Sequence, residues 1–270
     1  MLVATCNVNG IRAAVRKGML DWVAQRQPDV LLLQEVRAPE ELTAQLLEDF
    51  QVVQQASELK GRAGVAIAVR PGIKLGKTNI GLSAGLDDGG EPPVDTGRWV
   101  EAYLPEVDTV VVSAYLHSGV ATDEQKMTAK YAHLDRVSVR LDELRAQHER
   151  VLVAGDFNIV HTELDIKNYK PNHNKTAGVL DREIAYLDDW FGQRRWVDVH
   201  RQLVGAEQGP YTWWSQRGRA FDNDAGWRID YHMATAELAE TAVSAAVDRA
   251  DSYDTRWSDH APLCVTYQLG

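Results

Sequence analysis

Three short polar motifs contain the side chains best suited to chemistry: residues 155–158 (Gly-Asp-Phe-Asn), 227–230 (Trp-Arg-Ile-Asp) and 258–260 (Ser-Asp-His). Each motif directly precedes or follows an apolar run typical of a β-strand. Residues 34–35 (Gln-Glu) and Asn7 stand at the ends of two earlier strand-like runs. Because such strand ends can gather along one edge of a sheet, we expect these side chains to lie close together.

Carboxylate, amide and imidazole groups brought together in this way are suited to one kind of chemistry. Carboxylate and amide oxygens hold a hard divalent cation, and the cation activates water for attack on a phosphate ester. A carboxylate near a cation is normally ionised, as a general base must be. The motif set therefore predicts a metal-dependent phosphoesterase.

Taken one at a time, the residues also have structural interpretations. Glu35 could pair with Arg37 at the rim of a sheet, and Asn7 could be an ordinary turn residue. Asp156 and Asn158 could form an Asx turn after Gly155. The joint occurrence of suitable side chains at five strand ends favours the functional interpretation.

His260 has the same two interpretations. A histidine is more often a structural side chain than a catalytic one. A catalytic imidazole needs an orienting carboxylate, and Asp230 can supply it from another strand end. Asp230 directly follows residues 227–229, whose pattern indicates a strand. A charged residue is unusual at such a position, and this supports a functional pairing of Asp230 with His260.

The composition predicts one domain that spans residues 1–270. The chain has 270 residues, of which 44% are hydrophobic, so it can bury a large core. It contains no Ser/Gly/Pro-rich linker and no internal repeat. Residues 85–97 form the most loop-like stretch, and we expect them to be a surface excursion between strands.

The N-terminal run and the cysteine content predict a cytoplasmic protein. Residues 1–6 lead straight into a strand, without the basic and apolar regions of a signal peptide. No apolar run approaches membrane-spanning length, so we expect no membrane insertion. The only cysteines are Cys6 and Cys264, and two buried thiols fit a reducing compartment.

The formal net charge of -10 weakens a simple electrostatic case for binding nucleic acid. Several acidic residues belong to the proposed site, however, where bound cations would offset their charge. Local basic groups also occur, although each cluster alone is more often a solvated face. These groups are Arg12, Arg16, Lys17, Lys167, Lys170 and Lys175.

Periodicity predicts a layered α/β architecture with mixed sheets. Continuously apolar runs such as 30–33 and 151–154 indicate strands covered on both faces. Helices are expected at 13–26, 123–147 and 181–191. Strands are expected near 2–6, 29–34, 64–70, 98–104, 109–116, 151–155, 211–215, 228–233 and 262–268.

The order of the motifs resembles that of the exonuclease III family of abasic-site endonucleases, in the endonuclease/exonuclease/phosphatase superfamily. The resemblance covers residues 2–267, nearly the whole chain. It implies a four-layered α/β sandwich, with two mixed β-sheets face to face, flanking helices and a site at one edge. The matching segments are 7–10 (Asn-Val-Asn-Gly), 34–35, Tyr115, 155–158, 227–230 and 258–260.

The resemblance also implies Mg²⁺ or Mn²⁺ as cofactor. Glu35 would be the principal metal ligand, with Asn7 and Asp259 close to the ion. Asp156, helped by Asn158, would orient and deprotonate the attacking water. Whether Asp156 and Asn158 hold a second ion stays open.

Contacts to the phosphate are implied in the same way. His260, held by Asp230, would contact the scissile phosphate. Tyr115 would contact the same phosphate or the leaving oxygen.

An aromatic segment, residues 211–215 (Tyr-Thr-Trp-Trp-Ser), also resembles the family. Trp213, Trp227 and Ile229 would line an apolar pocket that admits a sugar without its base, while an intact nucleotide is too bulky. The alternative is core packing, since large aromatic residues at strand positions are usually interior. 

The resemblance extends to three basic residues. Arg12 and Lys17 match positions that contact phosphates, and Arg37 stands where relatives often have a lysine near the metal.

The chain departs from the family pattern at a few positions. Cys6 replaces a common tryptophan, and Asn9 stands where some relatives have aspartate. Residues 117–118 (His-Ser) follow the strand that ends near Tyr115, where relatives usually show proline and an amide residue. We therefore assign no phosphate contact to Ser118.

The resemblance implies hydrolysis of the phosphodiester on the 5′ side of abasic sites in duplex DNA. The same site would perform 3′→5′ exonuclease and 3′-phosphatase reactions on blocked 3′ ends, and we expect a monomer. Two alternatives remain: a non-specific nuclease or a lipid- or inositol-phosphate hydrolase of the same superfamily. A non-catalytic DNA-binding protein is disfavoured by the acidic charge and the complete ligand set.

Overall fold

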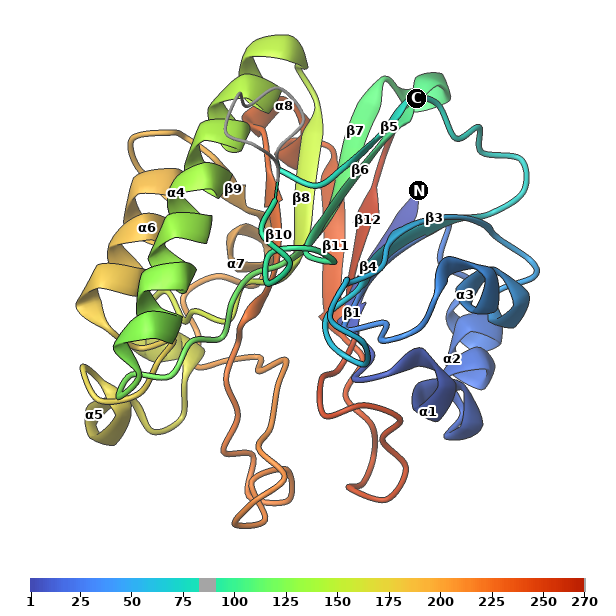
Figure 1. Cartoon of the computed structure of the whole chain (residues 1–270). Coiled ribbons are helices and arrows are strands. Elements are labelled where there is room, and N and C mark those ends of the chain that lie inside the picture. The colour runs from blue at the N-terminus through green and yellow to red at the C-terminus, as the bar shows by residue number, and fades with distance from the viewer. Residues whose placement is uncertain (83–90, 270) are drawn as a thin grey trace.

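The computed structural model describes residues 1–82 and 91–269, and two six-stranded mixed sheets form its centre (Figure 1). In sheet order, the first sheet contains β11 (Ala242–Val247), β12 (Leu263–Tyr267), β1 (Leu2–Asn7), β2 (Val30–Gln34), β4 (Val65–Val69) and β3 (Gln51–Gln55). The second contains β5 (Thr78–Ile80), β6 (Trp99–Leu104), β7 (Thr109–Tyr115), β8 (Val151–Asp156), β10 (Asp230–Ala234) and β9 (Val197–Asp198).

Helices cover the outer faces of both sheets, which gives the four layers seen in Figure 1. The first sheet is covered by α1 (Ile11–Arg16), α2 (Met19–Arg26) and α3 (Glu40–Leu46). The second is covered by α4 (Glu124–Gln147) and α6 (Asp181–Phe191). Shorter helices are α5 (Tyr169–Asn172), α7 (Val199–Val204) and α8 (Ala236–Ala239). The predicted four-layered sandwich is confirmed.

Alternate residues of the central strands pack into different layers. Val30 and Leu32 of β2 belong to the core between the sheets, whereas Leu31 and Leu33 pack toward α1–α3. A strand buried on both faces needs apolar residues at every position. This explains the continuously apolar run from which the strand was predicted.

Most predicted elements are present, with two corrections. The expected helix over 13–26 is two helices, because Gly18 between them adopts φ 102, a left-handed conformation that a continuous helix does not allow. Residues 211–215 do not form a strand; Trp213 makes only isolated bridges, to Trp227 and His260. 

Four strands were not predicted: β3, β5, β9 and β11. These strands are short or partly exposed and lie at or next to sheet edges, so an apolar run does not mark them. The short helices α3, α5, α7 and α8 were also not predicted. In the stretch expected to be a loop, 85–90 lie outside the described residues, and 91–97 contain turns without a helix or strand.

The sheet topology brings the polar motifs to one edge. β1 runs parallel to β2, with Asn7 opposite Gln34, and β7 runs parallel to β8, with Tyr115 opposite Asp156. β10 is antiparallel to β8 and begins with Asp230 opposite Asp156. The carboxyl ends of four strands and the start of β10 therefore meet at the same edge.

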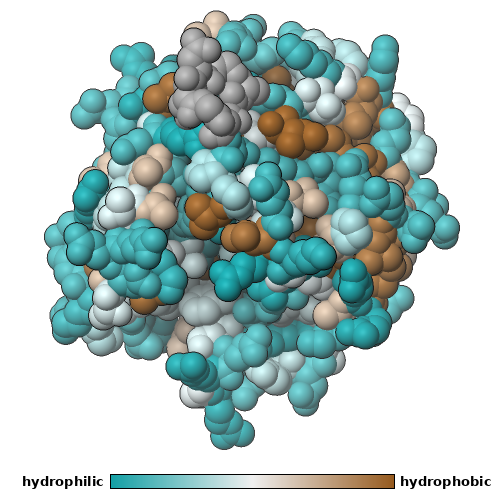
Figure 2. Space-filling model, viewed as in Figure 1, coloured by the Kyte–Doolittle hydropathy of each residue, from teal (hydrophilic) through white to brown (hydrophobic). Residues whose placement is uncertain are grey.

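The face of the molecule seen in Figure 2 is mostly hydrophilic, with hydrophobic residues scattered across it. Among the described residues, exposed large hydrophobic side chains such as Leu20, Ile80 and Val139 belong to different elements. Within the same described ranges, no helix has both the length and the apolar character required to cross a bilayer. Cys6 and Cys264 are free, buried thiols, as predicted.

Two buried histidines predict that acid destabilises the fold. Burial lowers the pKa of His200 to about 4 and that of His232 to about 3, from 6.5. Below pH 6.5 the unfolded chain therefore binds more protons than the folded one, and stability falls as the pH is lowered toward those values. At about pH 5, each histidine should account for about 2 kcal/mol of lost unfolding free energy.

Urea unfolding at about pH 7 and pH 5 measures this effect. His232→Gln should lose less stability than wild type over the same pH interval, because glutamine does not titrate. Other ionisable groups contribute equally to both proteins, so an unchanged pH dependence in the variant would contradict the assignment.

Candidate active site

Asp156 occupies the centre of the edge and is 1% exposed. It is the last residue of β8. The residue before it, Gly155, must be glycine, because a Cβ there would lie 1.9 Å from the carbonyl oxygen of Ala114 on β7. The two strands thus approach closely just before Asp156. The Gly-Asp pair therefore reflects packing of β8 against β7 as well as the turn that follows.

Asn7 links the two sheets by hydrogen bonds to one carboxylate at the edge of each. Its Nδ2 donates to Asp156 Oδ2 and to Glu35 Oε1, at 2.9 Å in each case. Asn7 is therefore not the simple turn residue considered from sequence. It holds together two acidic residues at the ends of strands that belong to different sheets.

Glu35 follows β2 in a left-handed conformation, with φ 47. The hydroxyl of Tyr115 donates to Glu35 Oε1 at 2.8 Å, and Arg37 forms an ion pair with Oε2. The rim ion pair with Arg37 and a place in the acidic cluster thus occur together. Burial, then the charges of Glu35 and Asp156, raise the pKa of Tyr115, so its hydroxyl stays protonated as a donor.

Asp230 and His260 form a buried pair behind Asp156. His260 Nδ1 lies 2.9 Å from Asp230 Oδ2, and His260 Nε2 lies 3.7 Å from Asp156 Oδ2. Burial alone would lower the pKa of His260, but the charges of Asp230 and Asp156 raise it to about 10. The imidazole is therefore a cation at neutral pH, with both N–H groups available as donors.

The pKa of Asp156 is raised to about 7, chiefly by burial. The charges of Asp230 and Glu35 act in the same direction, while His260 and the hydrogen bond from Asn7 oppose them. Crowded anionic groups of this kind favour a bound cation, which would lower the pKa of Asp156 again.

Asp259 lies beside a residue that was not selected from sequence. Asn9 Nδ2 donates to Asp259 Oδ1 at 2.9 Å, and the indole Nε1 of Trp213 lies 3.3 Å from Asp259 Oδ2. Asn9 belongs to the Asn-Val-Asn-Gly motif, where a short amide at a strand exit was the available signal. The contact itself joins residues 250 positions apart and has no local signature.

Asn158 is held in the turn that follows β8. Its backbone N–H donates to Asp156 Oδ1 at 2.9 Å, so the Asx turn considered from sequence is present. Lys130 Nζ donates to the carbonyl oxygens of Asn158 and Ser118, at 3.1 Å each, and pairs with Glu183 at 2.6 Å. A lysine in the middle of a helix gave no sequence signal for this role.

A cavity of about 570 Å³ opens over these groups. Trp213, Trp227 and Ile229 are among the residues that line it, and the two indoles meet edge to face with ring centroids 5.5 Å apart. Both tryptophans are partly exposed, whereas the neighbouring Trp214 is 1% exposed and belongs to the core. The core-packing alternative therefore describes Trp214 better than Trp213 or Trp227.

Other lining residues come from two loops that were not assigned from sequence. The first, residues 118–122, follows β7 and is called the pocket loop below. The second contributes Lys175, Thr176 and Ala177. From the sequence, Lys175 was noted only as one of the local basic groups.

The predicted basic residues do not all lie at the same place. Arg37 lines the main cavity. Lys17 lines a neighbouring cavity that also contains Asn9 and Asp259. Arg12 lines a third cavity together with Arg37 and does not reach the main one. Arg12 and Lys17 therefore lie outside the main cavity, in cavities that share residues with it.

The residues present fit a divalent cation with oxygen ligands. The carboxylates of Glu35 and Asp156 accept hydrogen bonds from the same amide nitrogen of Asn7, and both line the cavity together with Asn158 and Asp259. Asp230 Oδ1 is buried without a hydrogen-bond partner among the described residues. A set dominated by carboxylates is typical of Mg²⁺ or Mn²⁺ sites.

Two known proteins with similar sequences are nucleases. The exodeoxyribonuclease of Bacillus subtilis is 29% identical over 97% of this chain and 98% of its own length. The DNA repair nuclease APEX1 of Danio rerio is 28% identical over 98% of this chain and 81% of its own length.

Solved structures agree in fold. An AP endonuclease from Archaeoglobus fulgidus has a TM-score of 0.82 and 25% identity, with all of both chains covered. A 3′-5′ exonuclease from Neisseria meningitidis has a TM-score of 0.85 and 25% identity, with 99% of both chains covered. The endonuclease/exonuclease/phosphatase family model matches residues 4–260. Within this family, the similar proteins are exodeoxyribonuclease III-like enzymes and abasic-site endonucleases. The chain therefore belongs to the endonuclease/exonuclease/phosphatase family.

Proposed function

We propose that this protein is a DNA-repair nuclease that hydrolyses the phosphodiester on the 5′ side of abasic sites in duplex DNA. The same site would perform 3′→5′ exonuclease and 3′-phosphatase reactions. One observation carries the proposal: Asp156 and His260, which Asp230 holds from behind, line the same cavity as the aromatic pair Trp213 and Trp227. Hydrolytic groups and a sugar-sized apolar surface thus share one cavity.

Asp156 is placed to act as the general base. It is buried beside the cavity, with Oδ2 fixed by Asn7 and Oδ1 by the backbone N–H of Asn158. A base fixed in this way can orient a water molecule and accept its proton. Its raised pKa favours proton acceptance, provided that neighbouring cations keep it ionised before the reaction.

His260 and Tyr115 are placed to stabilise the phosphate. The cationic imidazole is oriented by Asp230 and presents Nε2 toward Asp156. Tyr115 keeps its hydroxyl proton and lines the same cavity. Donors fixed in advance around a phosphate stabilise the charge that grows in the transition state.

A metal ion completes the set of positive charges. Glu35, Asp156 and Asp259, with the amides of Asn7 and Asn158, would hold Mg²⁺ or Mn²⁺, which when bound neutralises phosphate charge and activates water.

The aromatic surface supports abasic DNA as substrate over other phosphate esters. Trp213, Trp227 and Ile229 present an apolar surface to a cavity that Asp156 and His260 also line. A deoxyribose that has lost its base exposes apolar surface and is small enough to enter such a pocket. Duplex DNA would extend from the cavity toward Lys17 and Arg12 in the flanking cavities.

Trp227→Ala tests this assignment. Loss of the aromatic wall should lower kcat/KM for an abasic duplex by about ten- to a hundred-fold, because burial of a large apolar group contributes about 1.5–3 kcal/mol. Hydrolysis of a small aryl phosphodiester at the same site should change little. Equal losses on both substrates would favour the alternative, a phosphodiesterase without selectivity for abasic DNA.

We further propose that residues 1–270 act as one domain and as a monomer in the cytoplasm. The two free buried thiols and the full-length match to a bacterial exodeoxyribonuclease support this proposal. Sedimentation of the free protein and of its complex with an abasic duplex would measure the oligomeric state.

A further inference from the structure

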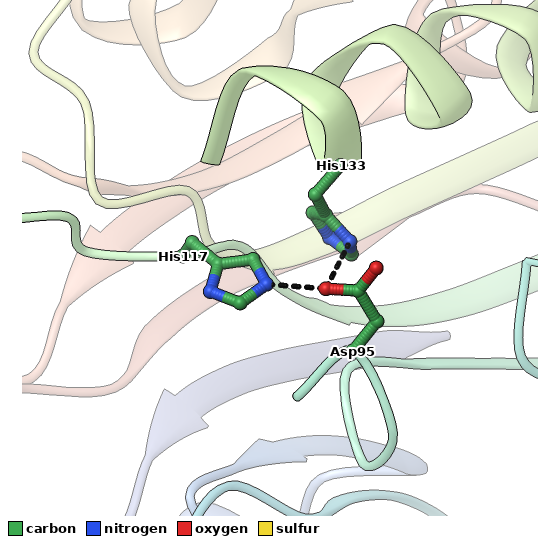
Figure 3. A group of neighbouring side chains, drawn as sticks. All are labelled: Asp95, His117 and His133. Carbon is green, nitrogen blue, oxygen red and sulfur yellow. Dashed lines mark hydrogen bonds and ion pairs between the residues drawn. The ribbon is translucent and has the colours of Figure 1, made fainter. Parts of the chain in front are cut away.

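A second cluster of polar side chains lies beside the active site and takes no part in the proposed reaction. Asp95 comes from the turns before β6, His117 from the start of the loop after β7, and His133 from α4 (Figure 3). All three are buried, with exposed fractions of 5%, 7% and 0%. His117 is also one of the residues by which the sequence departs from the family pattern.

The two imidazoles converge on one carboxylate. His117 Nε2 lies 2.6 Å from Asp95 Oδ1, and His133 Nδ1 lies 3.7 Å from the same oxygen. Figure 3 shows both rings pointing toward Asp95 from different elements. The three ligand atoms lie within 4.8 Å of one another.

Hydrogen bonds within the cluster do not satisfy His133. Both of its ring nitrogens are buried without a hydrogen-bond partner among the described residues, and 3.7 Å is too long for a hydrogen bond to Asp95. An unsatisfied buried polar group costs about 1–3 kcal/mol. A ligand bound between His133 Nδ1 and Asp95 would remove that cost for Nδ1.

The donor set selects the ligand. Two neutral imidazole nitrogens and one carboxylate oxygen form a set that Zn²⁺ prefers, with a second carboxylate oxygen or water as the fourth ligand. Burial lowers the pKa of His117 and lowers that of His133 well below its ordinary value. Both rings are therefore neutral at physiological pH, which is the form that binds a metal ion.

We propose that Asp95, His117 and His133 form a zinc site that fastens the pocket loop to α4. The proposal concerns a structural ion and is independent of the nuclease chemistry. His117 directly precedes Ser118, the first residue of the pocket loop. The site would thus hold one side of the substrate cavity in place.

Other contacts show that the pocket loop already depends on α4. Lys130, one turn before His133, donates to the carbonyl oxygen of Ser118. A Cβ on Gly119 would lie 2.7 Å from Met127 Sδ and 3.1 Å from Lys130 Cδ. A metal ion at His117 and His133 would add a link to the same interface, from the same helix face.

Nearby positive charges limit which ions can bind. Arg136 Nη1 lies 3.4 Å from Asp95 Oδ2. Arg98 stacks on the ring of Tyr115 and donates to the carbonyl oxygens of Val94 and Tyr115. These guanidinium groups disfavour Mg²⁺, which is held mainly by its attraction to negative charge. They disfavour Zn²⁺ less, because imidazole nitrogens are good ligands for zinc.

Zinc binding to the metal-stripped full-length protein tests the proposal. The titration is performed by calorimetry in excess Mg²⁺, which occupies the carboxylate-rich active site. We expect one equivalent of Zn²⁺ to bind and to raise the melting temperature. Co²⁺ in place of Zn²⁺ should give the visible absorption of a tetrahedral nitrogen- and oxygen-ligated ion.

The decisive comparison uses His133→Gln and His148→Gln. His148 directly follows α4 and lies outside the cluster, so its variant should bind zinc as wild type does. His133→Gln should lose at least about a hundred-fold in affinity, because loss of even a partner of a metal ligand costs ten- to a hundred-fold. His117→Gln gives a second test should His133→Gln fail to fold, with folding checked by circular dichroism without zinc.

Two results would overturn the proposal. One is the absence of zinc binding by the wild-type protein. The other is equal zinc affinity in wild type and the folded cluster variants. In either case, Asp95 and His117 would form only a metal-free hydrogen bond.

Discussion

Replacing His260 with alanine should lower kcat/KM for cleavage of an abasic duplex by roughly a hundred- to ten-thousand-fold, the range expected for loss of a positioned proton donor. The imidazole is cationic because Asp230 and Asp156 surround it. Alanine removes both the charge and the Nε2 donor at the cavity. Steady-state kinetics with Mg²⁺ on an abasic duplex measures the loss.

A matched pair of variants separates catalysis from folding. His260→Ala leaves the buried Asp230 without its partner, so the variant must be shown to fold by its circular dichroism and melting curve. Asp156→Asn keeps the size of the side chain but removes the base, and should cause a comparable loss. Cleavage at wild-type rates by either folded variant would exclude the proposed roles.

Duplex binding supplies the remaining control. Lys17 and Arg12 lie in the flanking cavities, so the contacts that they can make do not depend on His260. Affinity for an abasic duplex in Ca²⁺ should therefore fall far less than the cleavage rate. A parallel loss of both would mean that His260 mainly binds substrate.

Replacing Arg228 with methionine should lower the free energy of unfolding by about 3–5 kcal/mol, the usual cost of breaking a buried ion pair from one side. Arg228 is 0% exposed. Its Nε lies 2.7 Å from Asp165 Oδ1, and its Nη2 lies 2.7 Å from Asp198 Oδ2. Methionine would fill much of the space but leave two carboxylates largely buried. Asp165 would keep its ion pair with Arg201 and its hydrogen bond from the backbone N–H of Thr162.

The electrostatic consequence can be measured at the same time. Burial raises the pKa of Asp165, but Arg228 and hydrogen bonds hold it at about 2, below the ordinary 3.8. A lowered folded-state pKa stabilises the protein above about pH 3.8, and this stabilisation is lost as the pH falls through about 2. Arg228→Met should remove part of it, which urea unfolding as a function of pH would show.

Arg219→Ala is the matched control for Arg228. Arg219 pairs with Asp222 at 3.8 Å, and its side chain is 85% exposed. An exposed pair of this kind contributes about 0–1 kcal/mol. Similar losses in the two variants would mean that burial of Arg228 does not determine its contribution.

The Trp-Arg-Ile-Asp motif shows how one strand segment serves several purposes. Arg228 points into the buried ion-pair network, Ile229 lines the cavity and Asp230 orients His260. The alternation of neighbouring side chains in extended chain separates these roles. From the sequence, only the carboxylate and the apolar pair were selected, because a buried arginine resembles an exposed one in sequence.

The sequence by itself determined the inner strands of the two central sheets and the chemical type of the site. Continuously apolar runs mark strands buried on both faces, and the polar residue that ends each run is local information. Glu35, Asp156 and His260 could therefore be selected before any coordinates, and the structure places them together. Their catalytic roles stay predictions.

Only the tertiary structure decided which distant groups meet. Asn7 bonds to Asp156 across 149 positions and Asn9 to Asp259 across 250, and neither separation is encoded in a local pattern. The meeting of His133 with Asp95 likewise depends on how α4 packs against the second sheet. The physical reason is that burial and sheet packing bring side chains together over long range, whereas sequence periodicity reports only the neighbours of each residue along the chain.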